Sequence, residues 1–304
     1  MDDLLEFSER PRSEEVYMIA GWRQWADAGD TSSGLPEYLV EQMHARKIGE
    51  VKSDPFYLFQ LPGTHGFLRP EIKLVDGHRQ ELTAHQNQIY FSGNERKGLL
   101  IFVGDEPHMN MTRYAEAFFN IVKEFDVRRV AVVGGVYGPV PYDKDRDITC
   151  TYSLPRLKEE LAEYAVKFSN YEGPVSIGSY LADAAEKRNV EYLSFYAFVP
   201  MYDFSDLSPQ LQTMTVEQDA KAWYDIMRRF NHMFKLGLDL SDLERSSHKL
   251  IESVAQQIHQ VEKQAPQAEI REYLAKVNEG FTESSFMPLD EAWKRGLEDV
   301  LGDI

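Results

Sequence analysis

The stretch Val16-Tyr17-Met18-Ile19-Ala20-Gly21-Trp22-Arg23-Gln24-Trp25-Ala26-Asp27-Ala28-Gly29-Asp30 gives the strongest indication of the fold. The apolar run at its start predicts a strand. A glycine-broken loop then leads through Thr31-Ser32-Ser33-Gly34 into a segment with the spacing of a helix. In open α/β sheets such a loop lies at the carboxyl end of a strand, where ligands tend to bind. The stretch therefore predicts an α/β fold and marks a first candidate site.

Strand and helix patterns alternate through the first two-thirds of the chain. We expect strands over residues 16–20, 56–60, 71–75, 88–91, 99–103, 130–133, 175–177 and 193–199, and helices over residues 32–46, 110–125, 157–168 and 179–187. Gly134-Gly135 should end one strand, and Asp76-Gly77 is a hairpin turn signal. The alternation predicts a twisted, largely parallel central sheet with helices on both faces, with an antiparallel section over residues 56–91.

Beyond about residue 204 only helix patterns remain. Residues 205–209 have the composition of a linker, and Ser241-Asp242-Leu243-Glu244 has the spacing of a capping box. The expected helices cover residues 216–234 and 241–263 and begin again at Pro266 and Pro288. We therefore expect two units, an α/β domain over residues 1–205 and an all-helical region over residues 206–304.

Composition excludes several classes of protein. The net charge of −17 and the isoelectric point near 4.9 argue against binding to nucleic acid or to an anionic membrane surface, because both require clustered basic residues. No apolar stretch reaches the roughly 18 residues of a membrane span. The acidic start of the chain has no pattern of a signal peptide, and Cys150 is the single cysteine. We expect a cytoplasmic protein.

The loop over residues 21–30 admits two interpretations. In the functional one, Asp27 or Asp30 acts as a base or orients a ligand, and the N–H groups at the helix start hold an anion. In the structural one, Asp30 or Thr31 caps the helix, and Trp22 and Trp25 pack under the loop.

Two further loops follow predicted strands. Asp105 and Glu106, next to Gly104, could serve acid–base chemistry or a metal, or could favour the start of a helix. The loop from Gly134 and Gly135 to Pro141 allows close approach of a ligand to the backbone, but it matches neither dinucleotide nor P-loop spacing.

The remaining signals favour structural roles. Residues 143–147 carry aspartates at alternate positions, but Ile148 and Leu154 stand where a calcium loop requires Gly and Glu, so we expect a solvated acidic loop and no metal. The eight histidines show no ligand spacing, and Cys150 should be structural. We expect no cofactor.

The loops, in this order, resemble the PAC2 family, which is named for a proteasome assembly chaperone. The matching segments are Gly21-Trp22 with Asp27-Ala28-Gly29, Asp54-Pro55-Phe56-Tyr57, Arg69-Pro70, Asp76-Gly77, Gly104-Asp105-Glu106-Pro107, Arg113-Tyr114, Val127-Arg128-Arg129-Val130, Gly134-Gly135, Val140-Pro141, Tyr171-Glu172-Gly173-Pro174, Leu181-Ala182-Asp183-Ala184-Ala185 and Val199-Pro200. They span about residues 16–204, and the helical tail around Leu238-Asp239-Leu240 is similar to that of bacterial members.

The resemblance implies a sheet similar to the nucleoside phosphorylase/hydrolase fold and a tendency to form homo-oligomers, without implying phosphorylase activity. One departure concerns the loop after Pro141. Many relatives have Pro-His-Thr-Arg-Pro there, whereas this chain has Pro141-Tyr142-Asp143-Lys144-Asp145-Arg146. We therefore expect no role that needs that histidine in this chain.

Two functions follow as hypotheses. The first is an assembly or binding protein that contacts other protein chains. The second is a small-molecule enzyme of hydrolase or ligase type, in which Trp22 stacks on a ring, Asp27 or Asp105 acts as base, and Arg113 neutralises an anion. The candidate pocket for the second hypothesis comprises Trp22, Asp27, Gly29, Asp30, Gly104, Asp105, Glu106, Arg113, Gly134, Gly135 and Pro141.

Overall fold

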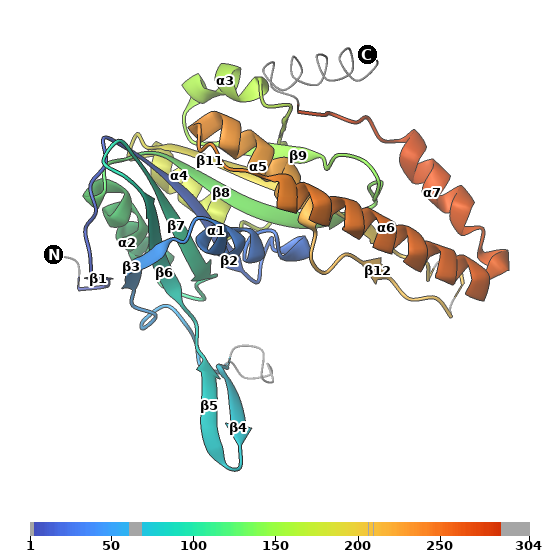
Figure 1. Ribbon diagram of the computed structural model, residues 1–304, viewed down its shortest axis with the longest axis horizontal. Coiled ribbons are helices and arrows are strands. Elements are labelled where there is room, and N and C mark those ends of the chain that lie inside the picture. Colours follow the sequence, from blue (N-terminus) through green and yellow to red (C-terminus); the bar gives the residue numbers. More distant parts are fainter. Residues whose placement is uncertain (1–2, 61–68, 206, 209, 287–304) are drawn as a thin grey trace, which may run out of the picture.

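A computed structural model describes residues 3–60, 69–205, 207–208 and 210–286. Its centre is one twisted sheet (Figure 1). The strands lie in the order β1 (Leu5–Phe7), β3 (Arg46–Val51), β6 (Asn87–Gly93), β7 (Lys97–Asp105), β2 (Glu15–Arg23), β8 (Val127–Gly138), β11 (Glu191–Tyr202), β9 (Ile148–Tyr152) and β10 (Lys167–Phe168), and β12 (Met214–Thr215) pairs with β11. The central strands β7, β2, β8 and β11 are parallel, while β1, β3 and β6 add an antiparallel section. The expected fold class is confirmed.

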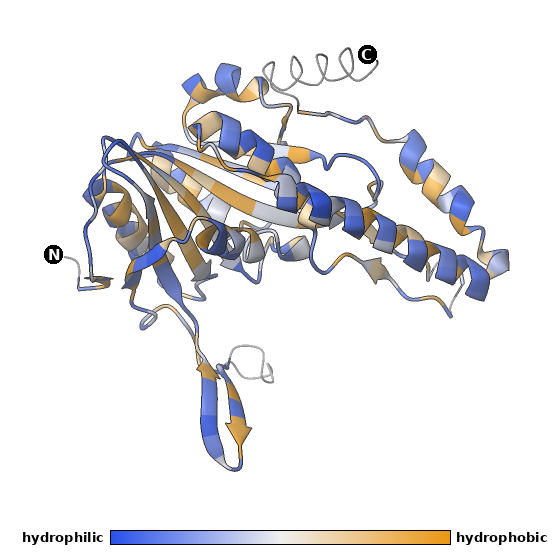
Figure 2. Cartoon of the chain, viewed as in Figure 1, coloured by the Kyte–Doolittle hydropathy of each residue, from blue (hydrophilic) through white to orange (hydrophobic). Residues whose placement is uncertain are grey.

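Helices cover both faces because successive residues of the central strands point to opposite sides. On β2, Met18 belongs to one buried apolar cluster and Ile19 to the other. The first cluster includes residues of α2 (Met111–Glu124) and α4 (Ile177–Glu186). The second includes residues of α1 (Gly34–Gln42), α5 (Ala220–Phe234) and α6 (Ser241–Gln264). Figure 2 shows the strands between these layers as largely hydrophobic.

Five further helical elements complete the described part of the fold. They are η1 (Ala28–Asp30), η2 (Pro155–Leu157), α3 (Lys158–Ala162), η3 (Pro266–Ala268) and α7 (Ile270–Glu279). Pro155 and Pro266 each occupy the first residue of a 3-10 turn, where proline costs no hydrogen bond.

Several boundaries differ from the sequence prediction. Residues 56–60 form no strand, and the expected strand over 175–177 is wrong because Ile177 begins α4. The helix expected over 157–168 ends at Ala162, and its last two residues instead form β10 beside β9. The capping box is also wrong, because α6 begins at Ser241 itself and the Ser241 N–H donates to Asp239.

The pair Gly134-Gly135 does not end a strand, since β8 continues to Gly138. A Cβ on Gly135 would lie 2.0 Å from the carbonyl oxygen of Ala28, and one on Gly134 would lie 2.4 Å from the ring of Tyr196. Because these glycines have no Cβ, a loop and an aromatic ring can pack closely against β8. The two glycines allow this close packing and do not end the strand.

The strands β4 (Glu71–Val75) and β5 (His78–Thr83) form a separate hairpin that projects from the body (Figure 1). Asp76 and Gly77 have φ values of 51° and 80°, as a two-residue primed turn requires. The expected hairpin turn is confirmed. We call residues 71–83 the arm.

The C-terminal helices pack on the sheet. Phe230 of α5 stacks on Phe195 of β11 at a ring-centroid distance of 5.0 Å, and the predicted α6 stripe buries Leu243 and Val254. One apolar cluster therefore spans residues on both sides of position 205, where the division into two units stays a prediction. The helix expected at Pro288 lies outside the described residues. Within the described residues, no helix combines the length and the apolar character needed to cross a membrane.

Candidate functional site

The loops after β2, β7 and β8 meet at one edge of the sheet, as their parallel arrangement predicts. Trp22 of β2 pairs in register with Gly104 of β7, and Asp27 forms an isolated bridge with Gly135 of β8. These residues belong to the candidate pocket and lie together. We call this edge, with its loops, the strand-end edge.

Asp27 organises its own loop. One oxygen of its carboxylate accepts hydrogen bonds from the N–H groups of Ser32 and Ser33, both at 2.8 Å. Burial raises the pKa of Asp27 to about 6, although these two hydrogen bonds act in the opposite direction. Asp27 therefore holds the residues just before α1, a capping role that the sequence assigned to Asp30 or Thr31.

Trp22 lies in the core, with only 2% of its surface exposed, between Phe102 and Phe118. Its Nε1 donates to the hydroxyl of Tyr114 at 2.7 Å, and that hydroxyl donates to Oδ1 of Asn87 at 2.7 Å. The indole ring therefore has no free face for a ligand. Trp25, by contrast, is 57% exposed, so the expectation that both tryptophans pack under the loop holds for Trp22 alone.

The two carboxylates after β7 are bound to backbone groups. Asp105 is buried, and its Oδ2 accepts from the N–H of Gln86 at 2.7 Å. Oε1 of Glu106 accepts from the N–H of Ile177 at 2.7 Å, at the first residue of α4. Burial raises the pKa of Glu106. The carboxylate of Glu106 therefore stabilises the positive end of α4, which is not the helix that follows this loop, and among the described residues Asp105 contacts no helix start.

The sequence did not predict a group of aromatic rings that lies beside Asp105. His85 stacks on Tyr57 at 4.4 Å between ring centroids, and His108 lies edge-on to both rings. Nδ1 of His108 accepts from the N–H of Leu58 at 3.1 Å, so Nε2 carries the proton in the neutral ring. Burial, reinforced by His85, lowers the pKa of His108. The only signal was the position of His108 directly after Glu106-Pro107.

Other members of the candidate pocket make contacts of their own or face solvent. Arg113 is on the outside of α2 and pairs with Asp3 at 3.2 Å. The carbonyl of Gly29 accepts from the N–H of Asp219, and Asp30 is exposed. The carbonyl of Pro141 accepts from Nη1 of Arg146. Of the candidate-pocket residues, only Trp22 lines the small cavity at this edge of the sheet.

The strand-end edge contains a small cavity. Its volume is about 10 Å³, and its lining includes Trp22, Trp25, Ser32, Ser176 and Tyr196. A space of this size holds about one water molecule, far below the volume that a nucleoside requires. In the described part of the chain, no group of three or more His, Cys, Asp or Glu residues could hold a metal ion.

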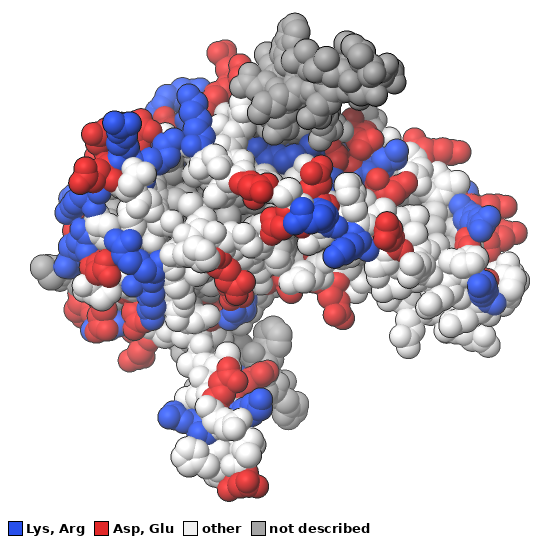
Figure 3. Space-filling view, viewed as in Figure 1, with Lys and Arg blue, Asp and Glu red and all other residues white. Residues whose placement is uncertain are grey.

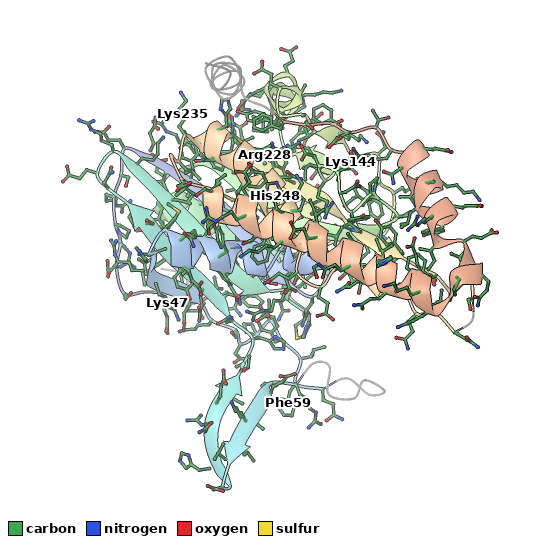
Figure 4. All side chains as sticks on the ribbon, turned by 45° about the vertical axis from the view of Figure 1, so that its right-hand side comes forward. Lys47, Phe59, Lys144, Arg228, Lys235 and His248 are labelled. Atoms are coloured by element: carbon green, nitrogen blue, oxygen red, sulfur yellow. The ribbon has the colours of Figure 1, made fainter. Side chains whose placement is uncertain are left out.

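The expectation of a solvated acidic loop over residues 143–147 is wrong. Arg146 is fully buried, and its Nε donates to the equally buried Asp219 at 2.8 Å. Asp145 pairs with Lys221 and Arg228 of α5. Burial raises the pKa of Asp145, but these two cations outweigh it and hold the pKa below its usual range. Figure 4 shows Arg228 and Lys144 on the side of the sheet where α5 and α6 lie.

Burial also defines Cys150. The thiol lies on β9 with 1% exposure, and burial raises its pKa to about 12. A thiol that stays protonated at neutral pH is a poor nucleophile, which supports the structural role expected from the sequence.

Comparison with known proteins assigns the family. The model of the PAC2 family matches residues 21–258, which is more than half of the chain, so the chain belongs to the PAC2 family. The resemblance expected from the sequence is confirmed, and the match extends beyond residue 204 into α5 and α6. No curated protein sequence matches the chain.

Solved structures share the fold. A PAC2 family protein from Streptomyces avermitilis is 22% identical, with a TM-score of 0.68 over 85% of this chain and 99% of that one. A proteasome-assembly chaperone homologue from Mycobacterium tuberculosis is 20% identical, with a TM-score of 0.67 over 79% and 94%. PbaB from Pyrococcus furiosus, described as an archaeal proteasome activator, is 16% identical, with a TM-score of 0.60 over 84% and 98%.

Proposed function

We propose that the chain is a binding or assembly protein that acts through contacts with other protein chains, including copies of itself. The proposal rests on one observation, the cluster of exposed apolar side chains on the arm. Ile72, Leu74 and Leu82 on the arm are each about half exposed, between 49 and 56%. Exposed apolar patches on a soluble chain mark surfaces that bind other proteins.

The descriptions of two similar structures support this proposal. One is described as a homologue of a proteasome-assembly chaperone and another as a proteasome activator, and both descriptions concern contacts between protein chains. We extend that kind of action, without a particular partner, to this chain. A cytoplasmic location belongs to the same proposal.

The small-molecule hypothesis has less support. Its aromatic platform, Trp22, packs against Phe102 and Phe118, and its cation, Arg113, is exposed and pairs with Asp3. The side chains that do meet there are bound to backbone groups, and the cavity beside them fits one water.

Light scattering after size exclusion tests the proposal, with the full chain at concentrations up to about 100 μM. We expect a mass above that of one chain, or a stoichiometric complex with a captured protein that re-forms from the purified components. A monomer that re-forms no complex would contradict the proposal. A thermal-shift panel of ATP with magnesium, nucleosides and phosphate runs in parallel. A ligand at 100 times its Kd should raise Tm by about 5–10 °C, which would favour the small-molecule alternative.

A further inference from the structure

The arm exposes its aliphatic side chains and packs on no other strand of the described residues. Every residue of β4 and β5 is exposed, and neither strand pairs with the central sheet. A two-stranded hairpin is marginally stable by itself, and it usually gains stability by packing one face against something else. We therefore expect a surface outside this hairpin to pack against the arm.

Strand register shows which face needs the cover. Ile72 lies directly opposite Leu82, and Leu74 lies opposite Arg79. Ile72 and Leu74 alternate along β4 and share a face, and residues directly opposite each other share that face too. A bulge at Gln80 shifts the register of β5, so that Arg79 lies opposite Leu74 and these four side chains lie on one side of the arm. Lys73 and Val75 lie on the other side. The apolar face thus consists of three aliphatic side chains and one cation near the tip.

A second exposed apolar surface lies on the strand-end edge. Tyr171 to Val175 are all exposed, and Trp25 lies beside them, because Trp25 and Ser176 line the same cavity. Tyr171 is held along this segment by a hydrogen bond from its hydroxyl to the carbonyl of Pro174. We call Trp25 with residues 171–175 the rim. Its large side chains, Trp25, Tyr171 and Val175, are between 57 and 70% exposed.

The two surfaces complement each other in charge. The apolar face of the arm carries Arg79, and the rim carries the exposed Glu172. The arm as a whole holds both signs of charge, as Figure 3 shows, so it is not an acidic strip suited to a basic partner. Two copies of a chain with net charge −17 repel one another at long range, so a cation on one surface opposite an anion on the other favours this contact over others.

We infer that the partner of the arm is a second copy of this chain, whose rim receives Ile72, Leu74 and Leu82 while Arg79 pairs with Glu172. This inference rests on the proposed function and adds the surfaces to it. Because the arm and the rim are different patches, the contact either repeats head-to-tail around a ring or occurs twice in a two-fold dimer that exchanges its arms.

Paired cysteine variants test the contact in the full chain. Cys150 is the sole cysteine and is buried, so an introduced cysteine is the only accessible thiol. We expect a mixture of Leu74→Cys and Val175→Cys to form a disulfide-linked dimer under mild oxidation at least about tenfold faster than either variant alone. Val75→Cys, on the opposite face of the arm, is the matched control and should link to Val175→Cys no faster than background.

A charge exchange gives an independent readout by sedimentation velocity. Arg79→Glu alone and Glu172→Arg alone should each raise the Kd of self-association about tenfold or more. Their mixture should associate like the wild type, because each arm then finds an opposite charge on the other variant. Lys73→Glu, on the other face, should leave the Kd unchanged. Circular dichroism melting confirms that every variant is folded.

Several outcomes overturn the inference, and they separate it from the proposed function. Rapid self-linking of Leu74→Cys would show that arms pack on arms. An associating wild type with no cross-link and no charge rescue would place the contact elsewhere and leave the proposed function intact. A monomeric wild type that binds another protein would replace the second copy with that protein. A wild type that stays monomeric and binds no other protein would contradict both the inference and the proposed function.

Discussion

The strand-end edge and the arm combine residue type and exposure in opposite ways. The edge gathers aspartate, glutamate and tryptophan, the residues of catalytic sites, yet Trp22 and Asp105 are buried and bonded within the chain. The arm has an ordinary amphipathic hairpin sequence, yet its apolar side chains face outward. Residue type therefore indicates what chemistry a segment can perform, and exposure decides whether the segment can perform it on another molecule.

The largest effect is expected from a variant that removes the buried ion pair between Arg146 and Asp219. Asp219→Ala should lower the free energy of unfolding by about 3–5 kcal/mol, because it leaves the guanidinium of Arg146 buried without its carboxylate. Urea denaturation measures the loss. The matched control is Asp143→Ala, an exposed residue on the same loop as Arg146, which should change stability by less than about 0.5 kcal/mol. Equal effects of the two variants would contradict the buried network.

The comparison becomes sharper if stability is measured as a function of pH, because the buried carboxyl group of Asp27 titrates near neutral pH. Its folded pKa of about 6 exceeds the ordinary value of 3.8, so the fold favours the protonated form. This stabilisation is complete below the unfolded pKa and is lost as pH rises through about 6.

Asn mimics the protonated form at every pH. The stability of Asp27→Asn relative to the wild type should therefore rise by about 2–3 kcal/mol from about pH 4 to about pH 7.5. Urea midpoints across this range measure it, and Asp143→Asn should show no such trend. A difference that stays constant with pH would contradict a buried Asp27 carboxylate.

Tyr114 tests whether Trp22 belongs to the core. Tyr114→Phe should cost about 1–2 kcal/mol, since Nε1 of Trp22 loses its acceptor in a buried place. Tyr171→Phe also removes one hydrogen-bonded hydroxyl, but from a side chain that is 70% exposed, and should cost less than about 0.5 kcal/mol. Thermal melting compares them, and a Tyr114 variant as stable as its control would mean that this hydrogen bond does not help to hold Trp22 in the core.

The smallest effect is expected on the arm. Leu74→Thr should change the stability of the monomer by less than about 0.5 kcal/mol, because the side chain is already half exposed. Leu181→Thr, at a fully buried position of α4, should cost about 3 kcal/mol. Denaturation at concentrations that prevent association measures both. A large loss at Leu74 would mean that the arm packs on its own body.

The sequence predicted the parts of the fold that depend on local patterns. The apolar runs at residues 16–20, 99–103 and 130–133 became β2, β7 and β8, and parallel pairing of these strands brings the following loops together. The turn at Asp76-Gly77 also follows from local chemistry. Period and turn signals carry such information because they concern neighbours within a few residues.

Contacts between distant residues could not be predicted in this way. Trp22 finds Tyr114 from 92 positions away, and Arg146 finds Asp219 from 73 positions away. Residues 167–168 have a helical pattern, but pairing with β9 decides their conformation. No local pattern states that the loop over 143–147 will be covered by α5, so its charges looked solvated.

Asp219 joins three segments that are synthesised far apart in time. Its N–H donates to the carbonyl of Gly29, and its carboxylate accepts from Arg146 and from the N–H groups of Lys221 and Ala222 at the start of α5. A ribosome adds about 5–20 residues per second, so the 73 positions from Arg146 to Asp219 take roughly 4–15 s. During that interval Arg146 lacks the carboxylate that pairs with it, so the loop over residues 143–147 can complete its native contacts only after the start of α5 has been made.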